Sequence, residues 1–180
     1  EPVTDVANYI KLGSVLPDAN MAWRNDFRWR NFNFGFMVSA RLGGVVFSRT
    51  QSMLDYYGVS EATAAARDAG GVMINGNDLV DANKWYTAIG GGNSVPQYYT
   101  YSATNVRLQE ASIGYTIPKK TLGDICEITL SLVGRNLWMI YNKAPFDPEI
   151  TASTGTYYQG LDYFMQPSAR TIGFSVRLQF

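Results

Sequence analysis

The sequence predicts an all-β fold, namely a segment of an antiparallel transmembrane β-barrel with long loops at one end. Three observations lead to this prediction. Apolar and polar residues alternate in five stretches, as they do in strands with two unlike faces. Short and very long connections between these stretches alternate along the chain. Aromatic residues gather near the expected strand ends, where membrane barrels carry interfacial aromatic girdles.

The alternating stretches are long for strands of a water-soluble sheet. We expect strands at roughly 21–29, 32–47, 104–117, 126–141 and 169–180. In the first stretch Trp23 and Phe27 share one face and Arg24 lies on the other. The third stretch changes phase partway, which predicts a β-bulge near Gln109–Glu110. Soluble strands usually have about 5–6 residues, whereas a tilted membrane strand needs about 9–11.

The short connections lie at one end of the expected sheet. A turn near Arg30–Asn31 joins the first two strands, and residues 118–124, with Pro118 and Gly123, join the third and fourth. If the strands are antiparallel, the C-terminus falls at this same end. Trp29, Phe32, Tyr115 and Phe180 fall there too, and Trp138 and Tyr141 fall at the other end.

The two remaining connections, 48–103 and 142–168, are long and lie at the opposite end. The first of them should contain a short helix at 60–69, with Ser60 as its N-cap and Gly70 as its stop. Outer-membrane barrels have short periplasmic turns and long extracellular loops. The two long connections are therefore expected to be extracellular loops.

Composition argues against several other functions. The chain has 15 basic and 15 acidic residues, so its charge offers no case for nucleic-acid binding. It contains no His and one Cys, and no nucleophile, base and orienting group can be assembled from its sequence. The polar stretch 75–83 lacks the closing glutamate of a calcium loop. We expect no enzyme activity, no metal site and no cofactor.

An alternative reading is a soluble or surface β-sandwich, which would bind a glycan or a protein through its Tyr-rich loops. Sandwich strands also alternate, but they are usually shorter than these. Small membrane barrels begin at about eight strands, and open sheet edges are not viable in lipid. A membrane barrel would therefore need strands from outside this chain.

Motifs in the second half resemble one family. They are TNVRLQEASIGYTIPKK, ITLSLVGRNLWMI, FDPEI and QPSARTIGFSVRLQF, in that order. Their order and spacing resemble the C-terminal end of SusC/RagA-type TonB-dependent transporters of Bacteroidota outer membranes. The first half, LGSVLPDANMAWRNDFRWRNFNFGFMVSARLGGVVFS, matches more loosely.

The resemblance implies the last five or so strands of a 22-stranded barrel in the outer membrane of a Gram-negative bacterium. Such transporters import oligosaccharides or peptides, use energy from TonB, and carry a SusD-type surface lipoprotein as a lid. The plug, the TonB-contacting segment and the N-terminal strands would be absent from this chain. The expected partners are the rest of the transporter, the lipoprotein, TonB through the plug, the substrate and outer-membrane lipid.

Aromatic residues in the long loops are the candidates for contact with the substrate or the lid. These are Tyr98, Tyr99, Tyr101, Tyr157, Tyr158, Tyr163 and Phe164. Exposed aromatic rings need some partner. The alternative is that the rings pack the loops onto one another.

The terminal strand presents four alternating apolar residues, Phe174, Val176, Leu178 and Phe180. The family resemblance implies that this ending is read by the outer-membrane assembly machinery. The alternative is an ordinary strand end whose last aromatic residue, Phe180, anchors at the membrane interface, and both roles are compatible.

Two polar motifs are expected to be structural. Arg135 and Asn136 belong to the GRN strand, where Arg135 would face the barrel lumen and pair with Glu127 or with plug carboxylates. Asp147, Pro148 and Glu149 form a rigid acidic turn, because Pro fixes φ and Asp can accept a hydrogen bond from its own backbone.

Overall fold

The computed structural model describes residues 7–149 and 155–180. Residues 150–154, including Ile150 of the FDPEI motif, and residues 1–6 lie outside the described part. The described chain forms two compact units. The sheet unit comprises 17–43, 103–149 and 167–180, and the loop unit comprises 7–16, 44–102 and 155–166. Each unit is described here by itself.

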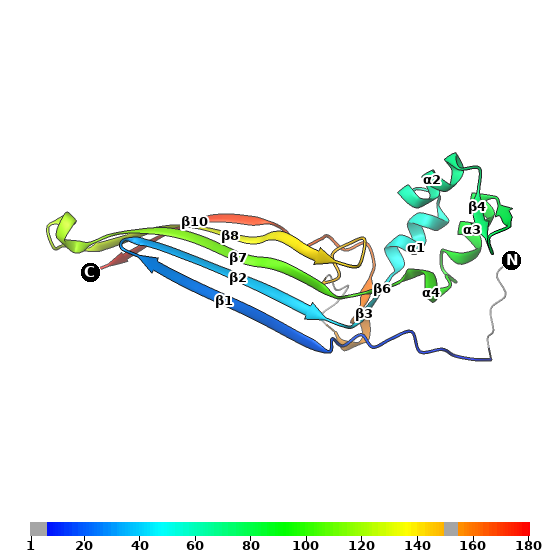
Figure 1. Cartoon of the computed structure of the whole chain (residues 1–180), viewed down its shortest axis with the longest axis horizontal. Coiled ribbons are helices and arrows are strands. Elements are labelled where there is room, and N and C mark those ends of the chain that lie inside the picture. Colours follow the sequence, from blue (N-terminus) through cyan, green and yellow to red (C-terminus); the bar gives the residue numbers. More distant parts are fainter. Residues whose placement is uncertain (1–6, 150–154) are drawn as a thin grey trace. The chain divides into compact units, whose positions relative to one another are not determined.

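The sheet unit is one antiparallel sheet in the order β1-β2-β7-β8-β10. Its strands are β1 (Ala19–Trp29), β2 (Phe32–Leu42), β7 (Asn105–Ile117), β8 (Glu127–Asn142) and β10 (Thr171–Gln179). Figure 1 shows these long strands running side by side. The first two form a hairpin, as do β7 and β8, whose connection contains the short 3-10 helix η1 (Lys119–Leu122).

Four of the five strands lie within two residues of the ranges expected from the alternation pattern. The second expected strand, 32–47, is interrupted. Gly43 and Gly44 have φ angles of 75° and 80°, a left-handed conformation that glycine adopts without steric cost. As a result β2 ends at Leu42, and Val45 begins a different strand in the loop unit.

The β-bulge expected near Gln109–Glu110 is confirmed. The β2–β7 register shifts between Met37 and Val38, and the β7–β8 register shifts between Leu108 and Glu110. Gln109 is the extra residue. The shift returns Leu108 to the face that carries Ile113, so both halves of β7 present their apolar residues on the same side.

The strand ends are arranged as the connection lengths predicted. The two-residue turn Arg30–Asn31 and the β7–β8 connection lie at one end, where Gln179 pairs with Glu127. Trp29 and Phe32 stack there with ring centroids 6.4 Å apart, and Phe32 meets Tyr115 edge-on at 4.9 Å. The long connections leave the sheet at the opposite end.

The loop unit combines short helices with small sheets. Its helices are α1 (Arg49–Tyr56), α2 (Glu61–Asp68), α3 (Ala82–Ile89), α4 (Pro96–Tyr99) and the 3-10 helix η2 (Thr156–Tyr158). The strands β3 (Val45–Ser48), β6 (Thr100–Ser102) and β9 (Leu161–Asp162) form a three-stranded sheet, and β4 (Val72–Ile74) pairs with β5 (Asp78–Val80). No helix among the described residues is long and apolar enough to cross a membrane.

The helix expected at 60–69 is confirmed as α2. The Ser60 hydroxyl accepts a hydrogen bond from the Thr63 backbone N–H at 3.1 Å, and Gly70 follows the helix with φ 81°. The other helices were not predicted. The buried residues of α1 are Ser52 and Asp55, so this helix lacks the apolar period from which an amphipathic helix is predicted.

Candidate functional site

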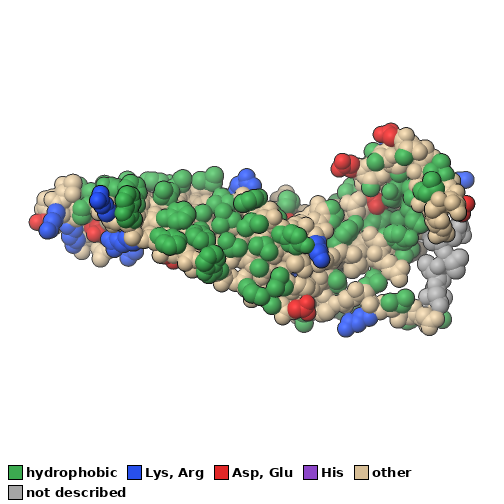
Figure 2. All heavy atoms as spheres, in the orientation of Figure 1, with side chains coloured by type: hydrophobic (Ala, Val, Ile, Leu, Met, Phe, Trp, Pro, Cys, Tyr) green, Lys and Arg blue, Asp and Glu red, His purple; other side chains and the backbone are tan. Residues whose placement is uncertain are grey.

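One face of the sheet is apolar and exposed over all five strands. One row of apolar residues crosses this face, with one residue from each strand. Each residue of the row lies opposite the next on the neighbouring strand: Phe27, Phe34, Ile113, Leu132 and Phe174. Each of them is at least 45% exposed. Figure 2 shows hydrophobic side chains gathered along the strands. A contiguous apolar surface of this extent marks a contact with lipid or protein.

The opposite face is polar and carries a charge ladder across the sheet. Arg24 on β1 pairs with Asp26 at 2.9 Å and lies 3.9 Å from Glu110 on β7. Glu110 also pairs with Arg135 on β8 at 3.1 Å. Arg24, Asp26 and Arg135 are more than half exposed, so each pair contributes only modestly to stability. The main effect of the ladder is to fix the positions of these charged side chains on the polar face.

Of the two partners expected for Arg135, Glu127 was wrong, and a pairing with plug carboxylates stays a prediction. Glu127 pairs in register with Gln179 near the short-turn end, whereas Glu110 lies directly opposite Arg135. The sequence places Glu127 and Arg135 on one face of one strand, but it does not show which acid a neighbouring strand brings alongside. No charge from outside this chain is required to pair with Arg135.

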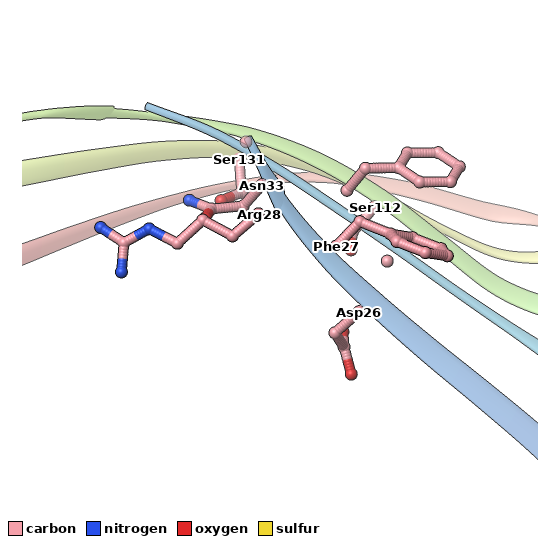
Figure 3. A pocket seen from close by; sticks show the side chains of 9 residues that line it. Asp26, Phe27, Arg28, Asn33, Ser112 and Ser131 are labelled. Carbon is pink, nitrogen blue, oxygen red and sulfur yellow. The ribbon is translucent and has the colours of Figure 1, made fainter. Parts of the chain in front are cut away.

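A recess of about 290 Å³, lined by polar side chains and by Phe27 and Phe34, lies beside this ladder. Figure 3 shows its side chains arriving from four strands: Asp26 and Arg28 from β1, Asn33 from β2, Ser112 from β7 and Ser131 from β8. Gly35 and Gly114 also line the recess, and the lack of a side chain at these positions keeps it open. A Cβ atom at Gly35 would stand 2.7 Å from an Asp26 carboxylate oxygen, and one at Gly114 would stand 2.7 Å from the Ser131 hydroxyl.

The polar side chains of this recess offer hydrogen-bond donors and acceptors. Serine, asparagine, arginine and aspartate side chains line it, together with Phe27 and Phe34. Across the residues that the structure describes, no three His, Cys, Asp or Glu side chains converge as a metal site would require.

The acidic turn forms a clasp, which we define as Arg107, Asp147, Glu149 and Ser168. Arg107 on β7 is only 4% exposed and donates to Asp147 Oδ1 at 2.6 Å, and Glu149 lies 3.4 Å from the same guanidinium nitrogen. The backbone N–H groups of Glu149 and Ser168 also donate to Asp147, at 3.1 and 3.3 Å. One carboxylate therefore ties β7 to both ends of the connection between β8 and β10.

The surroundings of Asp147 stabilise its charged form. Burial by itself raises the pKa of this carboxyl group. The hydrogen bonds from Ser168, Arg107 and the Glu149 backbone outweigh burial, so the pKa of Asp147 lies below its ordinary value. The expected bond between the Asp side chain and its own turn backbone is present, as the Glu149 contact shows.

Arg107 was not singled out from the sequence, although it is the buried centre of this clasp. It lies in the half of β7 that precedes the bulge, where the alternation is out of phase. The sequence gives little signal for it, because an arginine between Val106 and Leu108 is what any strand with one polar face shows. Its burial beside two carboxylates came from the structure.

Asn136 follows Arg135 in β8 and has a left-handed φ of 50°. Its side-chain amide donates to the Ala169 carbonyl at 3.1 Å. The GRN motif thus contacts the residues just before β10, and the structural role expected for Arg135 and Asn136 is consistent with these bonds.

The loop aromatics occupy different environments. Tyr99 is 1% exposed, so its ring offers no surface to a ligand, and its position fits the alternative of an aromatic that packs the loop unit. Burial, followed by the nearby Asp55 carboxylate, raises the pKa of the Tyr99 hydroxyl. Tyr101 on β6 is half-buried. Tyr98 is half-exposed and meets Trp85 edge-on with ring centroids 5.7 Å apart.

The remaining loop aromatics are exposed. Tyr157, which is 92% exposed, meets Tyr158 at 5.7 Å, and Tyr163 meets Phe164 at 5.2 Å. Both pairs are formed by neighbours in the chain. Their roles in binding a substrate or a lid stay predictions.

In the terminal strand, Phe174, Val176 and Leu178 pair with Leu132, Leu130 and Ile128 of β8. All three lie on the apolar face and are more than half exposed, as is Phe180 beyond the end of β10. This placement suits both an interface anchor and an assembly signal, and the signal role stays a prediction.

Comparisons with known proteins support the resemblance read from the motifs. No family model matches the sequence. A TonB-dependent receptor, P3 of Formosa agariphila, is 25% identical over 177 residues, which cover 94% of this chain and 17% of that protein. The solved structure of the RagAB peptide importer in an open-open state matches 93% of this chain and 18% of its own, with a TM-score of 0.66 and 14% identity.

The chain thus spans less than a fifth of the length of either protein. Its similarity to SusC/RagA-type TonB-dependent transporters is confirmed over nearly all its residues. Both relatives carry the names of a receptor or an importer rather than of an enzyme.

Proposed function

We propose that this chain forms part of the wall of a TonB-dependent transporter in the outer membrane of a Gram-negative bacterium. The observation that carries the proposal is the exposed apolar row that crosses all five strands opposite the polar charge ladder. A barrel wall needs this division, because alternate residues face lipid and lumen. The apolar face then contacts lipid, and the polar face lines the interior.

Other strands must complete the barrel. β1 and β10 are the outer strands of the sheet, and each has a neighbour on one side only among the described residues. An open edge in lipid leaves backbone groups unsatisfied, so both edges require partners. In the proposed function, further strands of a longer polypeptide supply them and close a barrel of 22 strands.

The orientation follows from the connections. The short-turn end, with Trp29, Phe32 and Tyr115, would lie at the periplasmic interface, where aromatic girdles occur. The loop unit and the connection between β8 and β10 would lie outside the cell. Exposed loop aromatics, Tyr157 and Tyr163 among them, would then meet a substrate or a partner arriving from outside.

The proposed activity of the complete protein is active uptake of an oligosaccharide or a peptide. A plug and TonB would supply gating and energy, and a SusD-type surface lipoprotein would cover the outward end. The support is the similarity to a TonB-dependent receptor and to a peptide importer. This segment would contribute wall and loop contacts rather than energy coupling.

The test uses the complete natural polypeptide expressed in a Gram-negative host. We expect it to be extracted from membranes only by detergent and to migrate faster on a gel before boiling than after. Both properties follow from a closed, detergent-stable barrel. Extraction by salt alone, with no change of migration on heating, would contradict the proposal and favour a soluble or surface binding module.

A further inference from the structure

The two last strands of the sheet separate before β8 ends. Their pairing stops at Thr171, which lies opposite Arg135, whereas β8 continues to Asn142. The residues just before β10 turn aside, because the Ser168 backbone N–H donates to Asp147. Among the described residues, no strand pairs with this side of β8 beyond Arg135. On this side the last residues of β8 are therefore not paired with a described strand.

A cavity of about 320 Å³ occupies this gap, and we call it the β8 wedge. Its walls include Asn136 and Trp138 of β8, Arg107 of β7, and Ser168 and Arg170 from the segment before β10. All of these residues belong to the sheet unit. The Asp147 clasp thus holds the wedge open.

Two buried polar atoms on its lining residues have no hydrogen-bond partner. They are the Arg107 Nε donor and the Asn136 Oδ1 acceptor. An unsatisfied buried polar group costs about 1–3 kcal/mol, so native structures rarely leave such groups unpaired. Arg107 is 4% exposed and is one of the residues that line the wedge. The Arg107 Nε donor and the Asn136 Oδ1 acceptor together indicate a ligand that accepts one hydrogen bond and donates another.

A cation and an aromatic ring also line the wedge. Arg170 takes part in no ion pair within the described part of the chain. Trp138 is 62% exposed. An arginine binds a carboxylate through two parallel hydrogen bonds, and an exposed tryptophan offers a rigid surface for apolar contact.

We propose that the β8 wedge binds a short extended peptide that carries a free carboxylate. Each peptide unit offers one N–H donor and one C=O acceptor, which match Asn136 and Arg107, and an extended chain can add to the open edge of β8. A neutral oligosaccharide would leave Arg170 unmatched. The proposal rests on the proposed function only in that the wedge would open at the outward end of the wall.

The experiment measures binding to the complete polypeptide in detergent by isothermal titration. The probes are N-acetyl-trialanine with a free carboxylate, the same tripeptide as its C-terminal amide, and maltotriose. We expect the carboxylate form to bind about tenfold more tightly than the amide. Arg170→Gln should abolish this preference, and the matched control Arg177→Gln, on β10 and outside the wedge, should preserve it.

Asn136→Ala should weaken the binding of both peptides about equally, since it removes a contact to the backbone. If that variant loses heat-modifiable migration, Trp138→Ala replaces it and should weaken both peptides as well. Binding of maltotriose alone, binding of neither class, or equal effects of the two arginine variants would overturn the proposal. A barrel that stays heat-modifiable while binding no peptide would leave the proposed function intact.

Discussion

Asp147 is the residue on which the connection between β8 and β10 depends. It accepts hydrogen bonds from a buried arginine and from two backbone N–H groups that lie far apart in the chain. Its neighbour Pro148 restricts the turn, so the carboxylate is held in place at little further entropic cost. The turn motif thus acts as a fastening for a loop, through a partner on another strand.

Asp147→Asn should loosen the loop and destabilise the protein by about 3 kcal/mol, because it leaves Arg107 buried with a weaker partner. The measurement is hydrogen exchange of the Ser168 amide in the complete polypeptide, which should quicken. Asp78→Asn, at an exposed position of β5, is the matched control and should leave that amide unchanged. Equal protection in both variants would show that the clasp does not hold the loop.

The effect of Asp147 on stability should depend on pH in a defined direction. Its folded pKa lies below the ordinary value of 3.8, so the contribution is complete above that value and is lost as pH falls through the folded pKa. The difference in thermal stability between wild type and Asp147→Asn should therefore shrink below about pH 4. A difference that stays constant down to pH 2 would contradict this assignment.

Tyr99 and Tyr157 come from the same set of candidate aromatics but should respond differently to substitution. Tyr99→Ala removes a fully buried ring and should destabilise the loop unit by about 3–5 kcal/mol. Tyr157→Ala removes an exposed ring and should leave stability within about 0.5 kcal/mol. Proteolysis of loop segments in intact cells measures both, and similar sensitivity of the two variants would contradict the assigned burial.

Among the elements, β7 shows how one residue keeps a strand in phase. Its alternation breaks at Gln109, and the bulge there turns Arg107 to the polar face and Leu108 to the apolar face. Without this extra residue the outer half of the strand would present its arginine to the apolar side. A one-residue shift of register exchanges the two faces of a strand.

Deletion of Gln109 should therefore prevent assembly of the proposed barrel. The deletion forces either Arg107 onto the apolar face or a mismatch with β2 and β8. We expect loss of the heat-modifiable form in the membrane fraction. Deletion of Asn77, in the exposed turn between β4 and β5, is the control and should keep that form, so normal assembly of the Gln109 deletion would contradict the role of the bulge.

β10 offers adjacent residues that test the two faces directly. Phe174 belongs to the apolar row, while Ser175 pairs with Ser131 on the polar face. Phe174→Lys should cost about 2–4 kcal/mol if it lies near the bilayer midplane, and Ser175→Lys should be tolerated. Abundance of the folded protein in the outer membrane is the measurement, and equal abundance of both variants would contradict a lipid-facing row.

At the scale of the whole molecule, the exposed apolar face and the two outer strands of the sheet favour association with other molecules. The chain exposes large aromatic side chains on one face of its sheet, and β1 and β10 each lack a second neighbour among the described residues. Exposed apolar strands of this kind associate with other chains unless they are covered. In the proposed barrel, lipid would cover this face and further strands would pair with both edges.

The 180-residue chain expressed alone should accordingly fail to remain monomeric in water. We expect it to sediment as aggregate in detergent-free buffer and to stay dispersed in detergent micelles, which cover its apolar face. Analytical ultracentrifugation measures both states. A folded monomer in plain buffer would contradict the lipid-facing assignment and favour a soluble sandwich.

Much of the sheet was readable from the sequence, since alternation depends only on the residues of one strand. The faces, the bulge at Gln109 and the short-turn end all followed from local pattern and connection length. The helices of the loop unit were mostly missed, because α1 buries Ser52 and Asp55 rather than an apolar stripe. Short helices stabilised by capping and tertiary contacts leave little periodicity to detect.

Contacts between strands could not be read in this way, because they depend on register. Two ion pairs, Arg135 with Glu110 and Arg107 with Asp147, join residues that are far apart in the sequence. The burial of Tyr99 likewise depends on the tertiary structure. Local alternation assigns each residue to one face of its strand, and this assignment can be made from the sequence alone. Which charge meets which, and where β8 parts from β10 to open a cavity, followed only when the strands were set side by side.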